Sequence, residues 1–262
     1  MSALAVAHRA QRSSAAPILC LAAVLAAMTG GWVVLAWRMS GMDMGPGGDP
    51  GALGWFTVSW AVMTLAMMLP AAAPAVLRVV RERPARAPSS AALFLAGYVA
   101  VWTLAGLLGY AVVIAVRDLH FASLAWSSAG RYVAGGAVTA AGLYQLTRVK
   151  RRWLARCVEP ESALRTPGRA GALFAGFEHG VSCVACCWTL MAALYALGMM
   201  SLAWMALLTV LIASERVVRR RTLAVRTVAA VLVILGIAVA VSPQSVPALS
   251  MPPKAPVMGR MS

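Results

Sequence analysis

Charged residues are scarce in this sequence, and acidic residues are the scarcest of them. Charged side chains make up 12% of the 262 residues, against roughly 25% in soluble domains, and only 8 residues are Asp or Glu. Hydrophobic residues make up 61% of the chain. The polar stretches between the apolar runs are too short to fold separately. The composition therefore excludes a soluble enzyme and predicts one membrane domain.

Several catalytic signatures are missing as well. The sequence has no P-loop, no Asp-rich ATPase signature and no hydrolase elbow, so an ATP-driven pump is not expected from this chain alone. Its 5 cysteines, three of them between positions 183 and 187, lack the spacing of an extracellular disulfide framework. The net charge of +15 would suggest nucleic acid on a soluble surface, but it is concentrated between apolar runs. The expected partner is the lipid bilayer, and no nucleic acid is expected.

Apolar runs dominate the sequence. A helix needs about 20 apolar residues to cross a bilayer, and seven runs approach this length: 18–37, 55–77, 91–116, 129–146, 172–197, 201–213 with its flanks, and 222–241. The first run is too long for a signal-peptide core and lacks a small-x-small cleavage site, so it is expected to remain as an anchor. The sequence predicts an all-α, polytopic transmembrane helix bundle over residues 1–241. A flexible tail containing Pro and Met is expected over residues 242–262.

Basic residues in the short loops predict the orientation of the bundle, because Lys and Arg remain on the cytoplasmic side. With the N-terminus inside, the inner segments carry most of the 23 Lys and Arg residues. The outer segments carry Arg38, Arg117, Arg131, Lys254 and Arg260. This bias predicts an inside N-terminus and an outside C-terminus in a bacterial plasma (inner) membrane. The basic runs themselves are interpreted as solvated cytoplasmic faces.

The fifth expected helix carries a stripe of soft metal ligands, namely His179, Cys183, Cys186 and Cys187. Spaced three and four residues apart, these side chains share a helix face about 100° wide and can meet one another. Any one of them alone is better explained as a packed small side chain, or as a histidine bonded to a neighbouring carbonyl. Three close cysteines beside a histidine favour metal or thiol chemistry instead.

The second expected helix carries the methionines Met63, Met67 and Met68. Methionines at this spacing more often pack against other helices than bind a metal. Here their expected depth in the bilayer, which matches that of the cysteines, favours metal binding. At 1.5 Å per residue, Met63 and Met67 lie about 12 and 18 Å from the outer boundary, and Cys183 and Cys186 about 16 and 21 Å from the inner one. In a hydrocarbon core of about 30 Å, both sets fall near the middle.

Methionines are also distributed asymmetrically between the two sides of the predicted bundle. The outer segments carry many, whereas the inner loops carry none apart from the initiator. The segment with Met39, Met42, Asp43 and Met44 is similar to short Met clusters that bind Cu(I) outside bacterial membranes, although flexible apolar side chains in a loop are the simpler alternative. Thiolate and thioether donors suit Cu(I). The expected cofactor is a metal ion, Cu(I) first; Zn(II) also suits Cys and His ligands but would not explain the methionines.

Two acidic residues lie in the predicted spans near their inner ends. Glu178 is a candidate to support the ligand stripe, because an acid inside a span is functional by default. It can orient His179 in trans, neutralise an arginine or reach the inner interface. Glu215 is expected to form an ion pair with its neighbour Arg216.

Together these motifs resemble a known family. The matching stretches are 60–70, which begins at Trp60, 142–145 with Tyr144 and Gln145, 179–188, Leu190-Met191, Gly198-Met199 and Glu215-Arg216. Over about residues 55–220 the chain resembles a bacterial family of predicted metal-binding integral membrane proteins, domain of unknown function 2182. The resemblance implies metal binding without an established activity. The residues expected to support the ligands are Glu178, Trp60, Tyr144, Gln145 and Glu215.

One position departs from the pattern of that family. The family carries a cysteine on each side of a short spacer in the basic loop after Gln145. Here Cys157 stands at the second position and Trp153 at the first. A paired-cysteine site in this loop is therefore not expected, and neither Cys157 nor Cys20 is assigned a role.

Three functions fit these residues. The first is Cu(I) handling in uptake, transfer or assembly of a copper site, with a periplasmic or extracellular metallochaperone or a membrane metalloenzyme as partner. The second is membrane thiol–disulfide exchange by Cys183 and Cys186, although no outer-loop cysteine pair is present to relay electrons. The third is a structural or assembly subunit whose cysteines only pack helices. Whether the chain is an enzyme stays open, with a non-enzymatic role preferred.

Overall fold

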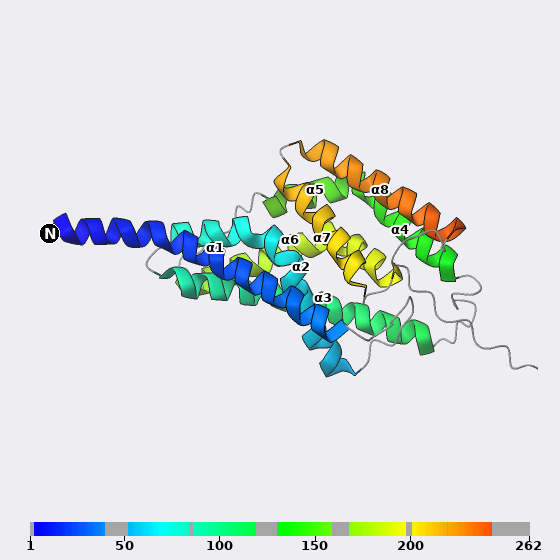
Figure 1. The fold of residues 1–262 in the computed structure, drawn as a ribbon, viewed down its shortest axis with the longest axis horizontal. Coiled ribbons are helices and arrows are strands. Elements are labelled where there is room, and N and C mark those ends of the chain that lie inside the picture. The colour runs from blue at the N-terminus through cyan, green and yellow to red at the C-terminus, as the bar shows by residue number, and fades with distance from the viewer. Residues whose placement is uncertain are drawn as a thin grey trace, which may run out of the picture.

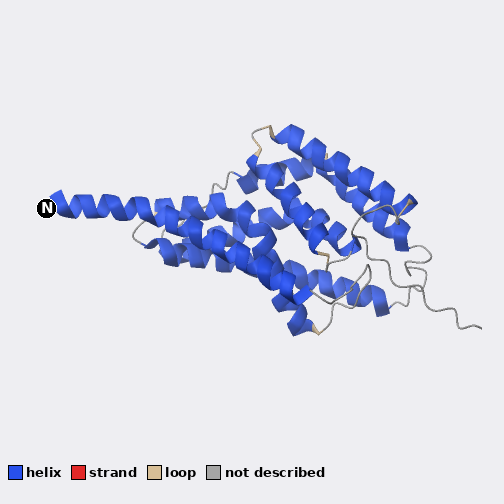
Figure 2. Ribbon diagram, viewed as in Figure 1, coloured by secondary structure: helices blue, strands red, loops and turns tan. Residues whose placement is uncertain are grey.

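The computed structural model describes residues 3–39, 52–83, 86–118, 130–158, 168–197, 201–218 and 220–242, and within these ranges it contains helices and no strand (Figure 1, Figure 2). The helices are α1 (Ala3–Met39), α2 (Leu53–Glu82), α3 (Ala87–Asp118), α4 (Arg131–Gln145), α5 (Arg148–Val158), α6 (Gly168–Leu197), α7 (Leu202–Val217) and α8 (Arg221–Val241). The predicted all-α class is confirmed. The predicted tail beyond Ser242 lies outside the described residues.

Among the described residues, five helical segments are long and apolar enough to cross a membrane, namely Ile18–Trp37, Leu53–Glu82, Ala87–Ala115, Gly168–Leu197 and Arg221–Val241. They match five of the seven predicted spans. Helices α4 and α7 have 15 and 16 residues, which is about 22 to 24 Å at 1.5 Å per residue, short of a hydrocarbon core of about 30 Å. The count of seven, the direction of the termini and the division at residue 241 therefore stay predictions.

The basic segment 148–158, predicted to be part of an inner loop, is a helix instead, and that prediction was wrong. In α5 the buried side chains Lys150, Leu154 and Cys157 follow the i, i+4, i+7 spacing of an amphipathic helix. Its arginines are exposed: Arg148, Arg151, Arg152 and Arg156. The sequence predicts a loop here because charged residues dominate the segment and its buried stripe is narrow.

The helices form two packed groups that meet at α6 and α7 (Figure 1). In the first group, α2 lies between α1 and α3, and α3 runs along α6. In the second, α4 pairs with α8. Helix α6 also contacts α4 and α5, while α7 contacts α2, α6 and α8. Helix α6 is therefore surrounded by helices from distant parts of the sequence.

Glycines bring α3 and α6 into backbone contact. A Cβ atom at Gly176 would overlap the carbonyl group of Phe94, and one at Gly97 would overlap the carbonyl oxygen of Leu173. Small residues at helix contacts allow this close approach in membrane bundles. Tyr98, next to Gly97 on α3, is thereby held against α6.

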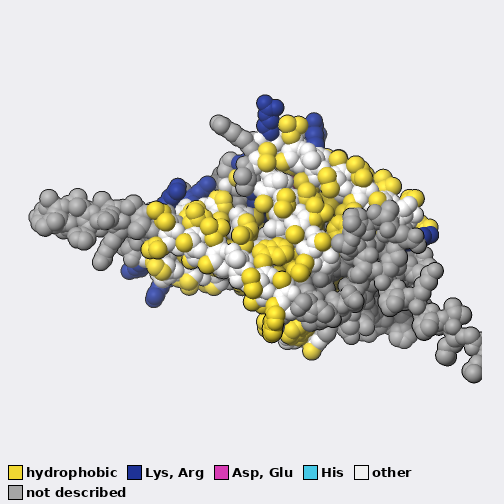
Figure 3. All heavy atoms as spheres, viewed as in Figure 1, with side chains coloured by type: hydrophobic (Ala, Val, Ile, Leu, Met, Phe, Trp, Pro, Cys, Tyr) yellow, Lys and Arg dark blue, Asp and Glu magenta, His cyan; other side chains and the backbone are white. Residues whose placement is uncertain are grey.

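The surface of the described part is apolar over the middle of the bundle. Large hydrophobic side chains are exposed on several helices, including Leu108, Trp188 and Ile234. Figure 3 shows hydrophobic side chains across the visible face and Lys and Arg side chains gathered at its margins. Exposed apolar patches of this extent mark an interaction surface, and a lipid-facing one fits the long apolar helices.

Candidate metal centre

The predicted ligand stripe of α6 is buried. Cys183, Cys186 and Cys187 are 0 to 1% exposed, and His179 is 2% exposed. The spacing of three and four residues places these side chains on one face of α6, and this face is directed inward. All three cysteines are free thiols. The sulfurs of Cys186 and Cys187 lie 3.3 Å apart, and the Cys186 thiol donates to the carbonyl oxygen of Cys183 at 3.2 Å.

A fourth thiol joins this stripe from another helix. Cys157 of α5 lies close enough to Cys183 and Cys186 for the three thiols to interact, and it is only 3% exposed. The sequence alone predicts no role for Cys157, because the charge of the segment around it indicates a basic loop. Helix α5 packs on α6 and points its buried stripe at the cysteines. We call Cys157, Cys183, Cys186 and Cys187 the thiol cluster.

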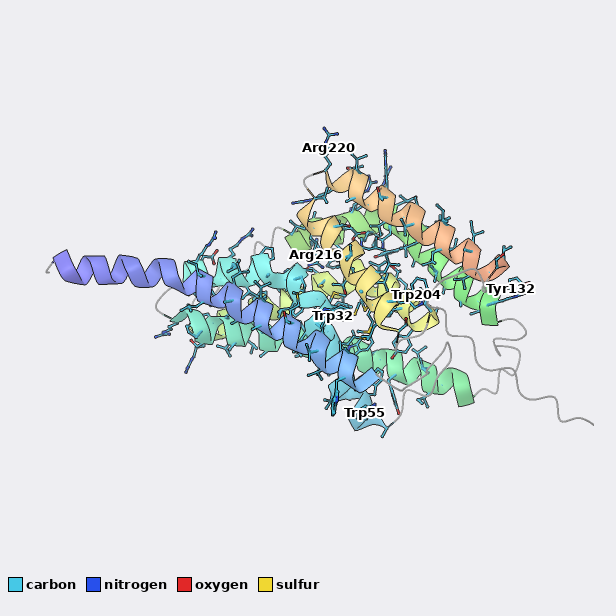
Figure 4. The ribbon with its side chains drawn as sticks, in the orientation of Figure 1. Trp32, Trp55, Tyr132, Trp204, Arg216 and Arg220 are labelled. Carbon is cyan, nitrogen blue, oxygen red and sulfur yellow. The ribbon has the colours of Figure 1, made fainter. Side chains whose placement is uncertain are left out.

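Arg216 of α7 is the cation that contacts the thiol cluster. Its Nη2 atom lies 3.0 Å from the Cys183 sulfur, 3.6 Å from the Cys186 sulfur and 3.7 Å from the Cys187 sulfur. Figure 4 shows Arg216 inside the bundle where α7 meets α2, whereas Arg220 projects outward beyond the end of α7. Three sulfurs thus surround one guanidinium nitrogen.

The predicted ion pair between Glu215 and Arg216 was wrong. Glu215 instead accepts a hydrogen bond from Nζ of Lys150 at 2.8 Å, and the two side chains are 1% and 0% exposed. The same ammonium group donates to the carbonyl oxygen of Cys186 at 2.7 Å. Glu215 therefore neutralises Lys150 and leaves the charge of Arg216 directed at the sulfurs.

His179 lies between aromatic rings of α3. Its ring centroid is 5.6 Å from that of Phe94 and 5.7 Å from that of Tyr98. Both ring nitrogens of His179 are buried, and among the described residues neither has a hydrogen-bond partner. Tyr98 in turn places its hydroxyl 3.1 Å from the Cys183 sulfur. An unpartnered buried imidazole is costly, and a soft metal ion is one group that would satisfy it.

The predicted methionine face of α2 lies in the same hydrophobic core as the α6 cysteines. Met63, Met67 and Met68 are 5%, 1% and 1% exposed. Helix α2 reaches the thiol cluster through Arg216, whose Nη1 donates to the carbonyl oxygen of Ala71 at 3.3 Å. Ala71 lies between Pro70 and Pro74, each of which removes a backbone donor from the helix.

The other residues predicted to support or capture the metal do not contact one another in one cluster among the described residues. Trp60 donates its indole N–H to the carbonyl oxygen of Trp102, and the Tyr144 hydroxyl donates to that of Ala185. Both bonds fix neighbouring helices beside the core. The amide of Gln145 and one carboxylate oxygen of Glu178 are buried without a hydrogen-bond partner among the described residues. The side chains of the predicted outer capture residues, Met39, Met42, Asp43 and Met44, lie outside the described residues.

A family model described as copper chaperone, PpoB2, matches residues 57–239, which is more than half of the chain. The chain belongs to the PpoB2 copper-chaperone family. No curated protein and no solved structure matches it. The predicted relation to copper is thereby supported, whereas the name domain of unknown function 2182 does not appear in the match and stays a prediction.

The PpoB2 match includes the whole thiol cluster, Arg216 and the methionines of α2. Cys20 and the predicted outer capture segment, residues 39–44, precede it. Thiol, thioether and imidazole groups are the soft and borderline donors that copper prefers. The donor set in the interior of this PpoB2 chain therefore fits copper as a cargo.

In the conformation described, however, no group of three or more His, Cys, Asp or Glu side chains within the described ranges is arranged as a metal-ligand set. The position of Arg216 gives a physical reason. Its Nη2 lies where three sulfurs of the cluster approach one another, so an ion bonded to these sulfurs requires the guanidinium to shift. The thiol cluster of the PpoB2 chain is thus arranged around a cation supplied by the protein itself.

Proposed function

We propose that this copper-chaperone family member holds Cu(I) at the thiol cluster inside the membrane bundle. The observation that carries the proposal is the meeting of Cys157 from α5 with Cys183 and Cys186 from α6 in a buried core. His179 supplies an unpartnered imidazole on the same face of α6. Four thiols and an imidazole at one buried place are more than packing of small side chains requires.

The chemistry is ligand exchange among soft donors. An incoming Cu(I) bonds to sulfur as a thiol proton leaves, so metal entry and proton loss are coupled. Zn(II) is the alternative cargo, since it also accepts Cys and His ligands. Thiolates select Cu(I) and Zn(II) over hard ions, and thioethers add a preference for Cu(I). Met63, Met67 and Met68 are proposed as weaker donors that an ion meets on its way to the cysteines.

The route begins outside. With the N-terminus on the cytoplasmic side, Met39, Met42, Asp43 and Met44 would capture the ion at the outer surface. The thiol cluster would then receive it from the methionines of α2. The partner in this proposal is a periplasmic or extracellular metallochaperone, or a membrane metalloenzyme whose copper site is assembled by transfer. The seven-span arrangement in a bacterial inner membrane belongs to the same proposal.

Two bonds support the proposed site from neighbouring helices. Tyr144 holds α4 to the backbone of α6 at Ala185, one residue before Cys186. Trp60 holds α2 to α3 at Trp102, one turn beyond Tyr98. Each bond fixes a helix that carries or contacts a proposed ligand, and a metal site needs such support to keep its donors oriented.

The decisive experiment is copper retention by the full-length protein, purified anaerobically in detergent and loaded with Cu(I). The wild type is expected to retain copper after desalting. A variant combining His179→Ala, Cys183→Ser, Cys186→Ser and Cys187→Ser is expected to lose it. Cys20→Ser is the matched control, because Cys20 is a half-buried thiol on α1 that precedes the matched region.

Equal copper retention by the wild type and the quadruple variant would contradict the proposal. Alkylation mass shifts separate it from thiol–disulfide exchange. A copper carrier keeps all of its thiols available for alkylation after copper removal. A disulfide-exchange enzyme protects Cys183 and Cys186 once oxidised and releases them on reduction.

A further inference from the structure

The positively charged guanidinium of Arg216 contacts the thiol cluster directly. Among the described residues, the side chain contacts three sulfurs and the carbonyl oxygen of Ala71. The adjacent carboxylate of Glu215 is held by Lys150 of α5. A partly buried charge such as that of Arg216 is stabilised by an opposite charge beside it. Of the groups that Arg216 contacts, only the sulfurs can carry one.

Arg216 is also held in place from α2. Its Nη1 donates to the carbonyl oxygen of Ala71 while its Nη2 contacts the sulfurs, so one planar guanidinium connects α7, α2 and α6. The rigid fork of an arginine suits such a two-sided arrangement better than a flexible ammonium. When an ion displaces Nη2 from the sulfurs, the contact with Ala71 keeps the positive charge nearby.

We propose that Arg216 is the residue that makes the thiol cluster selective for a monovalent soft cation and that it disfavours divalent ions. This inference rests on the proposed function. One guanidinium, one Cu(I) and two thiolates have a net charge of zero, so the monovalent ion is accommodated without an uncompensated charge. A divalent ion needs a third thiolate for the same balance, and it is repelled twice as strongly by the guanidinium.

The coordination geometries of the two ions also favour Cu(I) over Zn(II) at this cluster. Zn(II) in protein sites takes four ligands in a tetrahedral arrangement. Cu(I) bonds well to thiolates in linear or trigonal arrangements, which leave one side of the ion open. Because the bond to Ala71 keeps the displaced Arg216 beside the cluster, we expect its guanidinium to occupy the side on which a further ligand would have to approach.

The test compares Cu(I) and Zn(II) affinities of the full-length protein in detergent, measured anaerobically by competition with chromophoric chelators. Arg216→Gln removes the charge and keeps a polar, though shorter, side chain. We expect it to lower the ratio of Cu(I) to Zn(II) affinity by at least about tenfold. Arg216→Lys keeps the charge, so we expect its ratio of Cu(I) to Zn(II) affinity to be closer to the wild-type ratio than that of Arg216→Gln. Arg220→Gln is the matched control, because Arg220 is exposed and is expected to leave the ratio unchanged.

An unchanged ratio in Arg216→Gln would overturn the inference, and so would an equal drop in Arg220→Gln. A second measurement needs no variant: wild-type protein equilibrated with equal concentrations of Cu(I) and Zn(II) should retain copper and exclude zinc. Retention of both ions at similar levels would overturn the inference while leaving metal binding intact. A wild type that binds neither ion would instead overturn the proposed function.

Discussion

Lys150 of α5 and Glu215 of α7 form an ion pair of 2.8 Å in which neither side chain is more than 1% exposed. The same ammonium group bonds to the backbone of α6 at Cys186. One lysine therefore holds three helices together directly beside the thiol cluster. Since the pair connects residues 65 positions apart, it fixes the place of α5 against the bundle.

Breaking this pair from one side should destabilise the bundle strongly. Removing one partner of a buried ion pair leaves an uncompensated charge and costs about 3–5 kcal/mol. We expect Lys150→Met to lower the thermal unfolding midpoint in detergent, and the double variant Lys150→Met with Glu215→Leu to recover much of the loss. Arg152→Met on the exposed face of α5 is the control and should stay within about 0.5 kcal/mol of the wild type. A Lys150→Met variant as stable as this control would refute the expectation.

Cys157 should contribute to copper affinity although it lies on a different helix from the other three thiols of the cluster. Its side chain interacts with those of Cys183 and Cys186, so its sulfur lies near the other donors. We expect Cys157→Ser to weaken Cu(I) binding by about tenfold or more, equivalent to about 1.4 kcal/mol. The measurement is anaerobic competition with a Cu(I) chelator. Cys20→Ser should bind as the wild type does, and equal affinities for the two serine variants would show that Cys157 is no ligand.

The long helices and the ligand stripe of α6 were predictable because both depend on local sequence. A long apolar run has few alternatives to a membrane helix, and residues three or four apart on a helix must share a face. The apolar segment of α1, Ile18–Trp37, coincides with the first predicted run. The burial of His179 and the three cysteines follows from the same periodicity.

The partners of Arg216 and Cys157 were not predictable in this way. Consecutive residues on a helix do not face each other, so Glu215 and Arg216 point to different neighbours, and their adjacency in the sequence was misleading. Glu215 faces α5, whereas Arg216 faces α2 and α6. Each pairing depends on how α5 and α7 pack, which is set by contacts between distant segments.

The signal for α5 was nevertheless present in the sequence. Lys150, Leu154 and Cys157 occupy one face at helical spacing, and a test for that period would have found the helix. The same period places Cys157 on the buried face of that helix. The position of Arg216 has no comparable signal, because a basic residue at the inner end of a span is also what the positive-inside rule predicts.

The contact between α3 and α6 should tolerate no side chain at Gly176. A Cβ atom there would overlap the Phe94 carbonyl group, which lies one turn before Tyr98. We expect Gly176→Ala to cost about 1–3 kcal/mol through overpacking. Gly109→Ala, on the same pair of helices but with open space around its added Cβ, should be neutral or stabilising by up to about 1 kcal/mol. Thermal unfolding in detergent measures both, and equal midpoints would contradict the backbone contact.

Copper affinity should rise with pH, and Cys157 should account for part of the slope. This thiol lies on α5, outside the long apolar helices. Its hydrogen bond with Cys183 is the largest influence on its pKa, and together with burial it outweighs the opposing hydrogen bond with Cys186, so the pKa is raised. A thiol with a raised pKa is protonated at neutral pH, whereas the metal ligand is the thiolate. Cu(I) must therefore displace a proton from Cys157, and this becomes easier as the pH increases.

The wild type should consequently gain affinity more steeply with pH than Cys157→Ser does. One displaced proton corresponds to a difference of about one decade in affinity per pH unit below the pKa of the group. Chelator competition between about pH 6 and about pH 8 measures both slopes, within the range where the thiol is still protonated. Cys20→Ser should show the wild-type slope, because Cys20 packs against the part of the core around Val76 and Phe94, which is separate from the core that holds the thiol cluster. Parallel slopes for the wild type and Cys157→Ser would mean that Cys157 keeps its proton when copper binds, and the thiolates would then come from α6 alone.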